Sequence, residues 1–334
     1  MKAIGYRTPG PIDQPDSLVD LELPAPTPGP RDLLVCVAAV SVNPVDTKVR
    51  ASRAPQADAA EVLGWDAVGT VEATGAEVQH YRVGDRVFYA GSIARPGTNA
   101  ELHVVDERIV GRAPMQLSDA EAAAMPLTAI TAWELLFDRL GVPQGGGQGQ
   151  SLLIVGGAGG VGSILIQLAR QLTQLQVVAT ASRPETRQWC LDLGAHTVID
   201  HRQPFAAQLP GGSVNFVAAL TQTDQHLPQI VDALRPQGRL ALIDDPNVLD
   251  VGLLKRKSLS LHWELMFTRS LYDTPDIDQQ RVLLNEVAAL ADAGRIRSTL
   301  QQTLAPINAA NLRQAHALIE SGKALGKVVL QGWG

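Results

Sequence analysis

The clearest chemical pattern in this 334-residue chain is a run of glycines between an apolar segment and an amphipathic one. Gly157, Gly159 and Gly162 have the spacing G-x-G-x-x-G and follow Ser151–Val155, which is typical of a buried strand. A backbone without Cβ atoms lets a pyrophosphate come close, and the N-terminus of the next helix offers unpaired N–H groups. The pattern predicts a dinucleotide-binding turn rather than a merely glycine-rich one. The predicted phosphate-binding residues are Gly157, Gly159, Gly160, Val161 and Gly162.

The end of the next strand indicates which dinucleotide binds. Sites that prefer NAD usually place an acidic residue there, where it binds the ribose 2′-hydroxyl. This chain has Ser182 and Arg183 instead, followed by Arg187. A hydroxyl and a guanidinium suit a 2′-phosphate, so the sequence predicts NADPH as the cofactor. The alternative is that Arg183 is an ordinary exposed residue at a helix start.

Two further strand ends are candidate cofactor contacts. Leu220 and Asp244 each follow an apolar segment, and ligands gather at the carboxyl ends of parallel strands. The apolar stretch His262–Phe267 borders a substrate pocket in one interpretation and packs into the core in the other.

Composition excludes several classes of protein. A net charge of -6 and a pI near 5.6 argue against binding of nucleic acid, because nothing would neutralise phosphates in bulk. No apolar stretch approaches the roughly 20 residues that cross a bilayer, and no secretory signal is visible. Two distant cysteines, Cys36 and Cys190, do not make a disulfide framework. We therefore expect a cytoplasmic protein with no membrane partner.

The order of elements predicts two domains. Short strands separated by Pro and Gly loops fill the first third and favour a compact, barrel-like β domain. Strands then alternate with helices from Ser151 onwards, which predicts an α/β domain with a parallel sheet. The predicted strands of the first part are 33–42, 67–73, 86–90 and 101–105, and those of the second are 151–155, 177–180, 197–199, 215–218 and 239–243. The segment 327–330 is predicted to be a last strand that rejoins the first domain.

Several ordered motifs extend over nearly the whole chain. They are Asn43-Pro44-Val45-Asp46, the segment 63–71, Val83-Gly84-Asp85-Arg86-Val87, the segment 127–133, the glycine turn and the segment 321–327. In this order they resemble the medium-chain dehydrogenase/reductase superfamily, in its quinone oxidoreductase and zinc-type alcohol dehydrogenase-like branch. The resemblance implies a GroES-like β-barrel catalytic domain at 1–126, completed by 268–334, and a Rossmann domain with a doubly wound parallel sheet at 127–267.

The departures from that family concern zinc. The zinc enzymes that this chain resembles carry a Cys where it has Asn43, and Gly-His-Glu where it has Gly64-Trp65-Asp66. A catalytic zinc needs about three protein ligands, and two of the expected ones are missing. Two cysteines also cannot supply the family's four-cysteine structural site. We expect no metal.

Without a Lewis acid, the suitable substrates are those that delocalise the incoming electron pair themselves. Quinones and α,β-unsaturated carbonyls do so, which predicts an NADPH-dependent quinone or enone oxidoreductase. The alternatives are a zinc-dependent alcohol dehydrogenase and an NADPH-binding sensor or structural protein with little turnover. The family analogy also suggests a homodimer.

Catalytic candidates come from the resemblance. They are Asn43, Asp46, Lys48 and Tyr89, with Thr131 beside the nicotinamide ring. Lys48 stands where a Tyr is frequent, and it could donate a proton if burial lowered its pKa. The alternative is that Lys48 is a solvated loop residue and Asp46 stabilises a turn.

Overall fold

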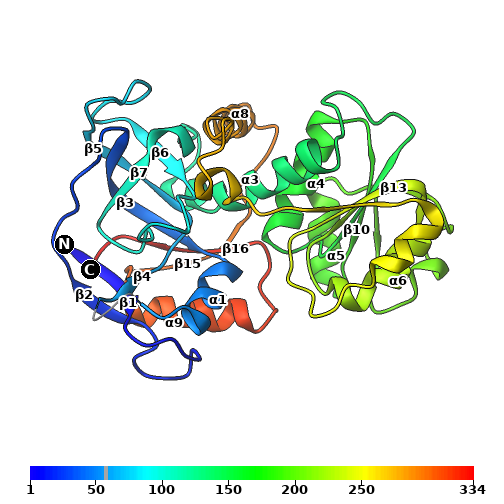
Figure 1. Ribbon diagram of the computed structural model, residues 1–334, viewed down its shortest axis with the longest axis horizontal. Coiled ribbons are helices and arrows are strands. Elements are labelled where there is room, and N and C mark those ends of the chain that lie inside the picture. The colour runs from blue at the N-terminus through cyan, green and yellow to red at the C-terminus, as the bar shows by residue number, and fades with distance from the viewer. Residues whose placement is uncertain (56–58) are drawn as a thin grey trace. The chain divides into compact units, whose positions relative to one another are not determined.

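The computed structural model describes residues 1–55 and 59–334. The chain divides into two compact units (Figure 1). Unit 1 contains Met1–Ile130 and Phe267–Gly334, and unit 2 contains Thr131–Met266. In the part of the chain that the structure describes, no helix combines the length and the apolar character needed to span a membrane.

Unit 2 is built on a six-stranded sheet in which every neighbouring pair is parallel. Its strands are β9 (Ser151–Val155), β10 (Gln176–Thr180), β11 (Thr197–Ile199), β12 (Val214–Ala219), β13 (Leu234–Leu242) and β14 (Ser260–Trp263). They lie in the order β11-β10-β9-β12-β13-β14. The chain starts in the middle of the sheet and reverses direction between β9 and β12, which is the doubly wound Rossmann arrangement.

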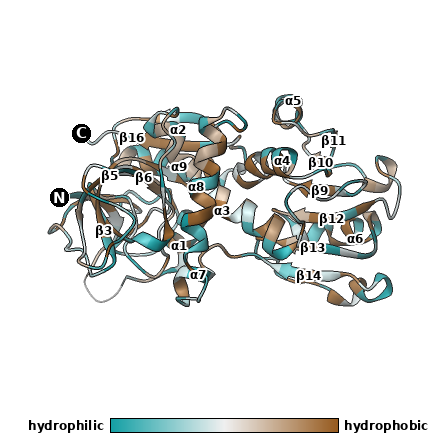
Figure 2. Ribbon diagram, turned by 90° about the horizontal axis from the view of Figure 1, so that it is seen from above, coloured by the Kyte–Doolittle hydropathy of each residue, from teal (hydrophilic) through white to brown (hydrophobic). Residues whose placement is uncertain are grey.

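Helices pack on this sheet because each buries one apolar stripe. They are α4 (Gly160–Leu172), α5 (Pro184–Asp192) and α6 (Thr223–Ala233), with 3₁₀ turns at Phe205–Ala207 and Val251–Lys257. A π-helical turn, Glu134–Arg139, follows directly on α3 (Pro126–Trp133). The strands β9 and β12 are apolar and buried along almost their whole length, as a sheet covered on both faces requires (Figure 2).

Unit 1 is mostly antiparallel. Its larger sheet runs β15-β16-β3-β5-β6-β8, with β7 also paired to β3. These strands are β3 (Asp32–Val42), β5 (Ala67–Thr74), β6 (Arg86–Tyr89), β7 (Leu102–Asp106), β8 (Val110–Arg112), β15 (Leu300–Leu304) and β16 (Lys327–Gln331). A smaller sheet contains β1 (Lys2–Tyr6), β2 (Val19–Glu22) and β4 (Glu61–Val62). This is the GroES-like domain.

The helices of unit 1 are α1 (Pro44–Ser52), α2 (Asp119–Ala123), α7 (Thr268–Leu271), α8 (Gln279–Asp292) and α9 (Ala309–Glu320), with a 3₁₀ turn at Glu107–Ile109. Helices α2, α8 and α9 contact strands of these sheets. Helix α2 begins with a capping box, in which Ser118 and Glu121 bond reciprocally. Strand β16 pairs with β3, so the C-terminal segment does rejoin the first domain as expected.

The predicted strands agree with the structure to within one or two residues at most ends. The exception is β13, which begins at Leu234, five residues before the predicted start at Arg239. The strands β1, β2, β4, β8, β14 and β15 are not among the predicted ones. The segment from Asn43 onwards is not a loop, because α1 starts directly after it.

Candidate functional site

Helix α1 places two of the predicted catalytic residues. Asn43 is the N-cap of this helix, and Pro44 occupies its first turn, where the missing N–H costs nothing. The Asp46 carboxylate accepts from the Asn43 backbone N–H at 2.7 Å. Asn43 and Asp46 are each only 1% exposed. The motif Asn-Pro-x-Asp therefore fixes the start of a helix inside unit 1.

A lysine from the last strand completes this cluster. The ammonium of Lys327, in β16, donates to the side-chain oxygen of Asn43, to the Val42 carbonyl at 3.2 Å and to Asp66 Oδ2 at 3.0 Å. The amide nitrogen of Asn43 donates to the same Asp66 oxygen at 2.8 Å. Asp66 Oδ1 in turn accepts from the Leu127 N–H at 2.7 Å. The four side chains Asn43, Asp46, Asp66 and Lys327 form what we call the lysine cluster.

The charges of the lysine cluster do not balance if every group is ionised. It contains two carboxyl groups, Asp46 and Asp66, and one cation, Lys327. Burial raises the pKa of Asp46 to about 7, opposed by the Asn43 backbone N–H and by the Lys327 charge and assisted by the Asp66 charge. Burial also raises the pKa of Asp66, with Lys327 opposing. The cluster therefore holds a proton well above the usual pH range of a carboxyl group.

The two other catalytic candidates lie in contrasting surroundings. Lys48 is exposed on α1. Tyr89 is fully buried in β6, where its hydroxyl lies 3.1 Å from His103 Nδ1 and the two rings stack at 5.5 Å. Burial raises the pKa of Tyr89 well above its ordinary value. Within unit 1, Tyr89 is a packing residue and Lys48 a solvent-facing one.

The positions that resemble zinc ligands carry other chemistry. Trp65 is 1% exposed, its indole N–H donates to the Ser92 carbonyl at 3.3 Å, and its ring meets Phe267 edge-on at 6.1 Å. Both ends of the Asn43 amide are already bonded. An amide, an indole and a carboxylate are not the thiolate and imidazole set that zinc prefers. Among the described residues, no three His, Cys, Asp or Glu side chains are grouped so that they could hold a metal.

The glycine turn of unit 2 has the geometry that a diphosphate needs. It connects the end of β9 to α4, and Gly159 is the N-cap of that helix. A Cβ on Gly162 would lie 2.4 Å from the Gly156 carbonyl oxygen, so this glycine lets helix and turn pack closely. A Cβ on Gly159 would meet only the Gly156 oxygen, at 3.6 Å, which leaves its outer side open. The turn thus fits the phosphates of a dinucleotide.

Basic side chains surround the end of β10. Arg183 starts α5 and is ion-paired with Glu185 at 3.1 Å, with 41% of its side chain exposed. The Arg187 guanidinium is engaged by the Val198 carbonyl at 2.9 Å. Arg202, which follows β11, donates to the Ser182 carbonyl at 2.8 Å. Ser182 therefore lies among three arginines, of which Arg202 was not predicted.

The remaining predicted cofactor residues occupy strand ends and a helix. Leu220 follows β12, and its N–H donates to the Val155 carbonyl at 3.1 Å. Asp244 follows β13, where its carboxylate accepts from the Thr223 N–H at 2.8 Å and from the Thr223 hydroxyl. Thr131 lies in α3 and is 5% exposed. In this structure, Asp244 holds the start of α6.

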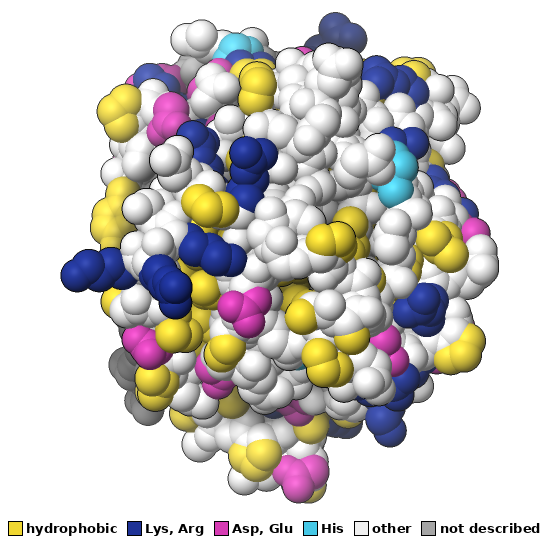
Figure 3. Space-filling model, turned by 90° about the vertical axis from the view of Figure 1, so that its right-hand side faces the viewer, with side chains coloured by type: hydrophobic (Ala, Val, Ile, Leu, Met, Phe, Trp, Pro, Cys, Tyr) yellow, Lys and Arg dark blue, Asp and Glu magenta, His cyan; other side chains and the backbone are white. Residues whose placement is uncertain are grey.

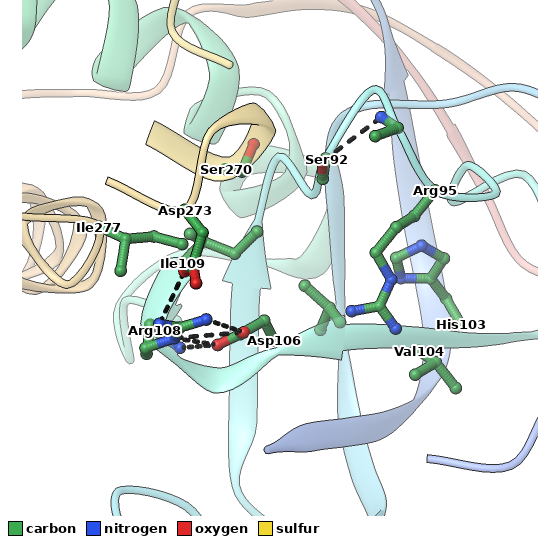
Figure 4. Close-up of a pocket in the computed structure, with 12 residues that line it drawn as sticks. Ser92, Arg95, His103, Val104, Asp106, Arg108, Ile109, Ser270, Asp273 and Ile277 are labelled. Carbon is green, nitrogen blue, oxygen red and sulfur yellow. Dashed lines mark hydrogen bonds and ion pairs between the residues drawn. The ribbon is translucent and has the colours of Figure 1, made fainter. Parts of the chain in front are cut away.

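A small pocket of about 160 Å³ lies within unit 1, formed by the segments 92–95, 103–109 and 270–277 (Figure 4). Its two guanidiniums are neutralised: Arg95 pairs with Asp32 at 2.8 Å, and Arg108 pairs with Asp106 at 2.7 Å and Asp273 at 2.9 Å. None of the four predicted catalytic residues lines it. Both arginines are already ion-paired with carboxylates, so neither provides an unpaired positive charge for an anion in this pocket.

Sequence reasoning missed Lys327 and Arg202 as site residues and treated Asp66 only as a lost zinc ligand. Lys327 lies 261 positions from Asp66, and no local pattern links the two. A signal did exist for Arg202, because Asp200-His201-Arg202 directly follows a predicted strand at the ligand edge of the sheet.

Known proteins resemble both parts of the chain. Residues 29–115 match the model of the alcohol dehydrogenase GroES-like domain, and residues 193–330 match that of the zinc-binding dehydrogenase domain. A zinc-type alcohol dehydrogenase-like protein of Staphylococcus aureus is 39% identical over 334 residues, which cover 99% of each chain. A quinone oxidoreductase of Pseudomonas aeruginosa is 29% identical, over 91% of this chain and 92% of its own.

Among solved structures, one of a Rhizobium etli protein, provisionally described as a zinc-dependent alcohol dehydrogenase, superposes with a TM-score of 0.96. It is 58% identical and covers 100% of this chain and 98% of its own. The chain belongs to the medium-chain dehydrogenase/reductase superfamily, and it is an oxidoreductase of that family.

Proposed function

We propose that this chain is a zinc-independent oxidoreductase that transfers a hydride from NADPH to a quinone or an α,β-unsaturated carbonyl compound. The observation that carries the proposal is the lysine cluster. The internal ammonium of Lys327 donates to the Asn43 amide oxygen and to the Asp66 carboxylate. Asn43 and Asp66 stand at positions where zinc enzymes of this family have metal ligands. NADPH, when bound, supplies the hydride.

The chain's own residues bind and orient the cofactor. The open side of Gly159 and the N-terminus of α4 receive the diphosphate. Ser182, Arg183 and Arg202 are the groups that fit a 2′-phosphate, and no acidic side chain stands directly at the end of β10. The cofactor-binding role is thus assigned to unit 2, and Thr131 is its proposed neighbour on the nicotinamide side.

The choice of acceptor follows from the side chains at the zinc-ligand positions, which do not suit a metal ion that would stabilise an alkoxide. Quinones and enones spread the incoming electron pair over a conjugated system, so the hydride step needs no metal to hold an alkoxide. The anion that forms then takes up a proton. Among the four predicted catalytic side chains, only Lys48 is exposed within unit 1, which makes it and solvent the proposed proton sources.

A panel of acceptors tests this proposal directly. We expect purified protein to oxidise NADPH with quinones or enones, and to leave saturated ketones and aldehydes almost unreacted. Metal analysis of the same preparation should give far less than one zinc per chain. About one tightly bound zinc per chain, with turnover of simple alcohols, would establish the metal-dependent alcohol dehydrogenase instead. Cofactor binding without any turnover would indicate a sensor or structural protein.

Replacement of Arg183 tests the cofactor preference. The side chain is 41% exposed, and the bonds of Arg183 to Thr186 at the start of α5 involve its backbone, so Arg183→Ala should leave the fold intact. A charge-assisted bond to a 2′-phosphate is worth about 1.5–3 kcal/mol. The NADPH Kd should therefore rise roughly tenfold to a hundredfold, while the NADH Kd changes little. Glu185→Gln, at the other end of the same ion pair, is the matched control. Equal losses for both cofactors would refute the assignment.

We also propose a homodimer and a cytosolic address. Strand β14 is the last strand of the unit 2 sheet, and an open edge presents unpaired N–H and C=O groups. Trp263 and Leu265, at its end, are 53% and 51% exposed. On the face in Figure 3, basic side chains are interspersed with acidic, hydrophobic and uncharged ones, so this face is not the continuous basic surface that a nucleic acid would need, and we propose a small molecule as the partner. Light scattering should give twice the chain mass.

A further inference from the structure

Unit 2 contains a buried acidic pair that the proposed reaction does not use. Glu134 is fully buried and Glu264 is 3% exposed. Arg139 Nε donates to Glu264 Oε2 at 2.7 Å, and Arg139 Nη2 lies 3.9 Å from Glu134 Oε2. The two carboxyl groups therefore lie beside the same guanidinium. We call these three side chains the glutamate cluster.

The charges of these buried groups indicate that the cluster retains a proton. Two carboxylates and the single guanidinium of Arg139 would leave an unpaired negative charge in the interior, whereas one retained proton makes the cluster neutral. Burial raises the pKa of Glu264 to about 9, with the Glu134 charge adding to the rise and Arg139 opposing it.

The charged and titratable groups around the cluster do not replace that proton. His262 comes from β14, and burial together with the charges of Arg239 and Arg139 lowers its pKa, so it is neutral at pH 7. The Arg239 guanidinium donates to the Leu140 carbonyl at 2.8 Å. Of the two arginines whose charges act on His262, Arg139 contacts the carboxyl groups of the cluster, whereas Arg239 bonds to a backbone carbonyl.

The cluster joins two segments that matter to the cofactor. Glu134 starts the π-helical turn one helical turn after Thr131. Glu264 directly follows β14, and its N–H donates to the Leu242 carbonyl at the end of β13. Parallel strands place their carboxyl ends at one edge of the sheet, so Glu264 lies at the edge that also carries the glycine turn. π-helical turns of this kind are frequent at functional sites.

We propose that Glu134 and Glu264 share one proton and act as positioning residues, which hold the π-helical turn that follows Thr131 to the backbone after β14 in the geometry that binds NADPH. This inference rests on the proposed cofactor role of unit 2. Loss of the proton places two negative charges side by side and separates the two segments, so cofactor affinity falls as the proton leaves.

Glu134→Gln is the variant that isolates the proton. Its amide can donate to the Glu264 carboxylate without a shared proton, and Arg139 then balances the one remaining charge. Asp138→Asn, at an exposed position in the same turn, is the matched control. Two measurements are made on each protein from pH 5 to pH 10: urea unfolding, and NADPH affinity by fluorescence titration.

The unfolding series tests the shared proton. The folded-state pKa of Glu264 lies above its unfolded value, so wild type loses stability as pH rises and levels off above about 9. Relative to Glu134→Gln, the wild-type unfolding constant should rise about tenfold per pH unit between pH 5 and pH 8. If the unfolding free energies of the two proteins changed in parallel with pH, the shared proton would be refuted, whatever the result of the NADPH titration.

The binding series tests positioning. The wild-type NADPH Kd should rise about tenfold between pH 7 and pH 10, with a midpoint near 9, while Glu134→Gln binds with a constant Kd. A pH-dependent stability with a flat wild-type Kd would reduce the pair to a structural feature and overturn the positioning role. Absence of NADPH binding by wild type at every pH would refute the proposed function and the positioning role together. The unfolding series would still show whether Glu134 and Glu264 share a proton.

Discussion

Each unit of this protein buries two carboxyl groups around a single cation, and the two solutions differ in the cation. In the lysine cluster of unit 1 the cation is 3% exposed and donates to three oxygens. In the glutamate cluster of unit 2 the side chain of Arg139 is 30% exposed; its Nε donates to Glu264 at 2.7 Å and its Nη2 lies 3.9 Å from Glu134. Burial raises the pKa of carboxyl groups in both clusters, so the clusters differ in how deeply the cation is buried rather than in whether a proton is retained.

This difference teaches how much each cation matters. A fully buried ammonium cannot be replaced by water, so the groups around it depend on it entirely. A guanidinium that still reaches solvent is partly screened, so solvent compensates part of its loss. The two clusters therefore have equal numbers of carboxyl groups and cations, and unequal sensitivity to losing the cation.

Removal of the cation should give the largest contrast. Lys327→Met leaves Asp46 and Asp66 buried without a cation, and such losses cost about 3–5 kcal/mol of unfolding free energy. Arg139→Met should cost only about 1–2 kcal/mol, because that side chain is partly screened. Urea unfolding of both variants at pH 7 measures the difference. Equal losses, or a larger loss for Arg139→Met, would contradict the comparison.

The second prediction concerns the proton in unit 1. The folded-state pKa of Asp46, about 7, lies above its unfolded value, so this group contributes stability that is complete below about pH 4 and lost progressively up to about pH 7. Asp46→Asn keeps an oxygen that can accept from the Asn43 N–H and removes the titration. Relative to wild type, the variant should gain about 1.4 kcal/mol per pH unit between pH 4 and pH 7 and nothing above that.

The outcome that contradicts this prediction is a variant whose stability runs parallel to wild type throughout that range. Thr47→Ser, at the neighbouring position of α1, provides a control for disturbance of the helix itself. Because the glutamate cluster titrates near pH 9, its decline continues after that of Asp46 has ended, and the two contributions separate on the pH axis.

Local patterns were sufficient for much of this molecule. Strand β9, the glycine turn and α4 are encoded by contiguous residues, since an apolar run, three spaced glycines and a helical stripe each act within a few residues. Asp46 was predicted as a site residue because the four-residue motif Asn43–Asp46 resembles one of the family. The strands β1 and β14 were missed because their pairing partners decide their structure more than their own composition does.

The parts that sequence could not supply are those that depend on distant partners. Lys327 was interpreted as the start of a strand, and its ammonium acquires a role only because β16 pairs with β3 beside Asn43. Glu264 lay in a segment described as apolar, and nothing in that segment indicates that Glu134 faces it. Exposure has the same limitation: the sequence placed Tyr89 and Lys48 in one group, and the fold buries the first and exposes the second.

The smallest effect expected is that of exchanging the kind of cation in unit 2. Arg139→Lys keeps the charge but replaces a planar fork by a single ammonium, which loses geometry at Glu264 Oε2 rather than neutrality. Since the side chain reaches solvent and the carboxyl pair holds its own proton, the cost should be below about 1 kcal/mol. The reciprocal change, Lys327→Arg, must fit a larger group among three fixed acceptors and should cost more, about 1–3 kcal/mol. If thermal unfolding ranked the two exchanges in the opposite order, the cation of unit 2 would be the more tightly specified one, and the difference between the clusters would have to lie elsewhere than in how deeply each cation is buried.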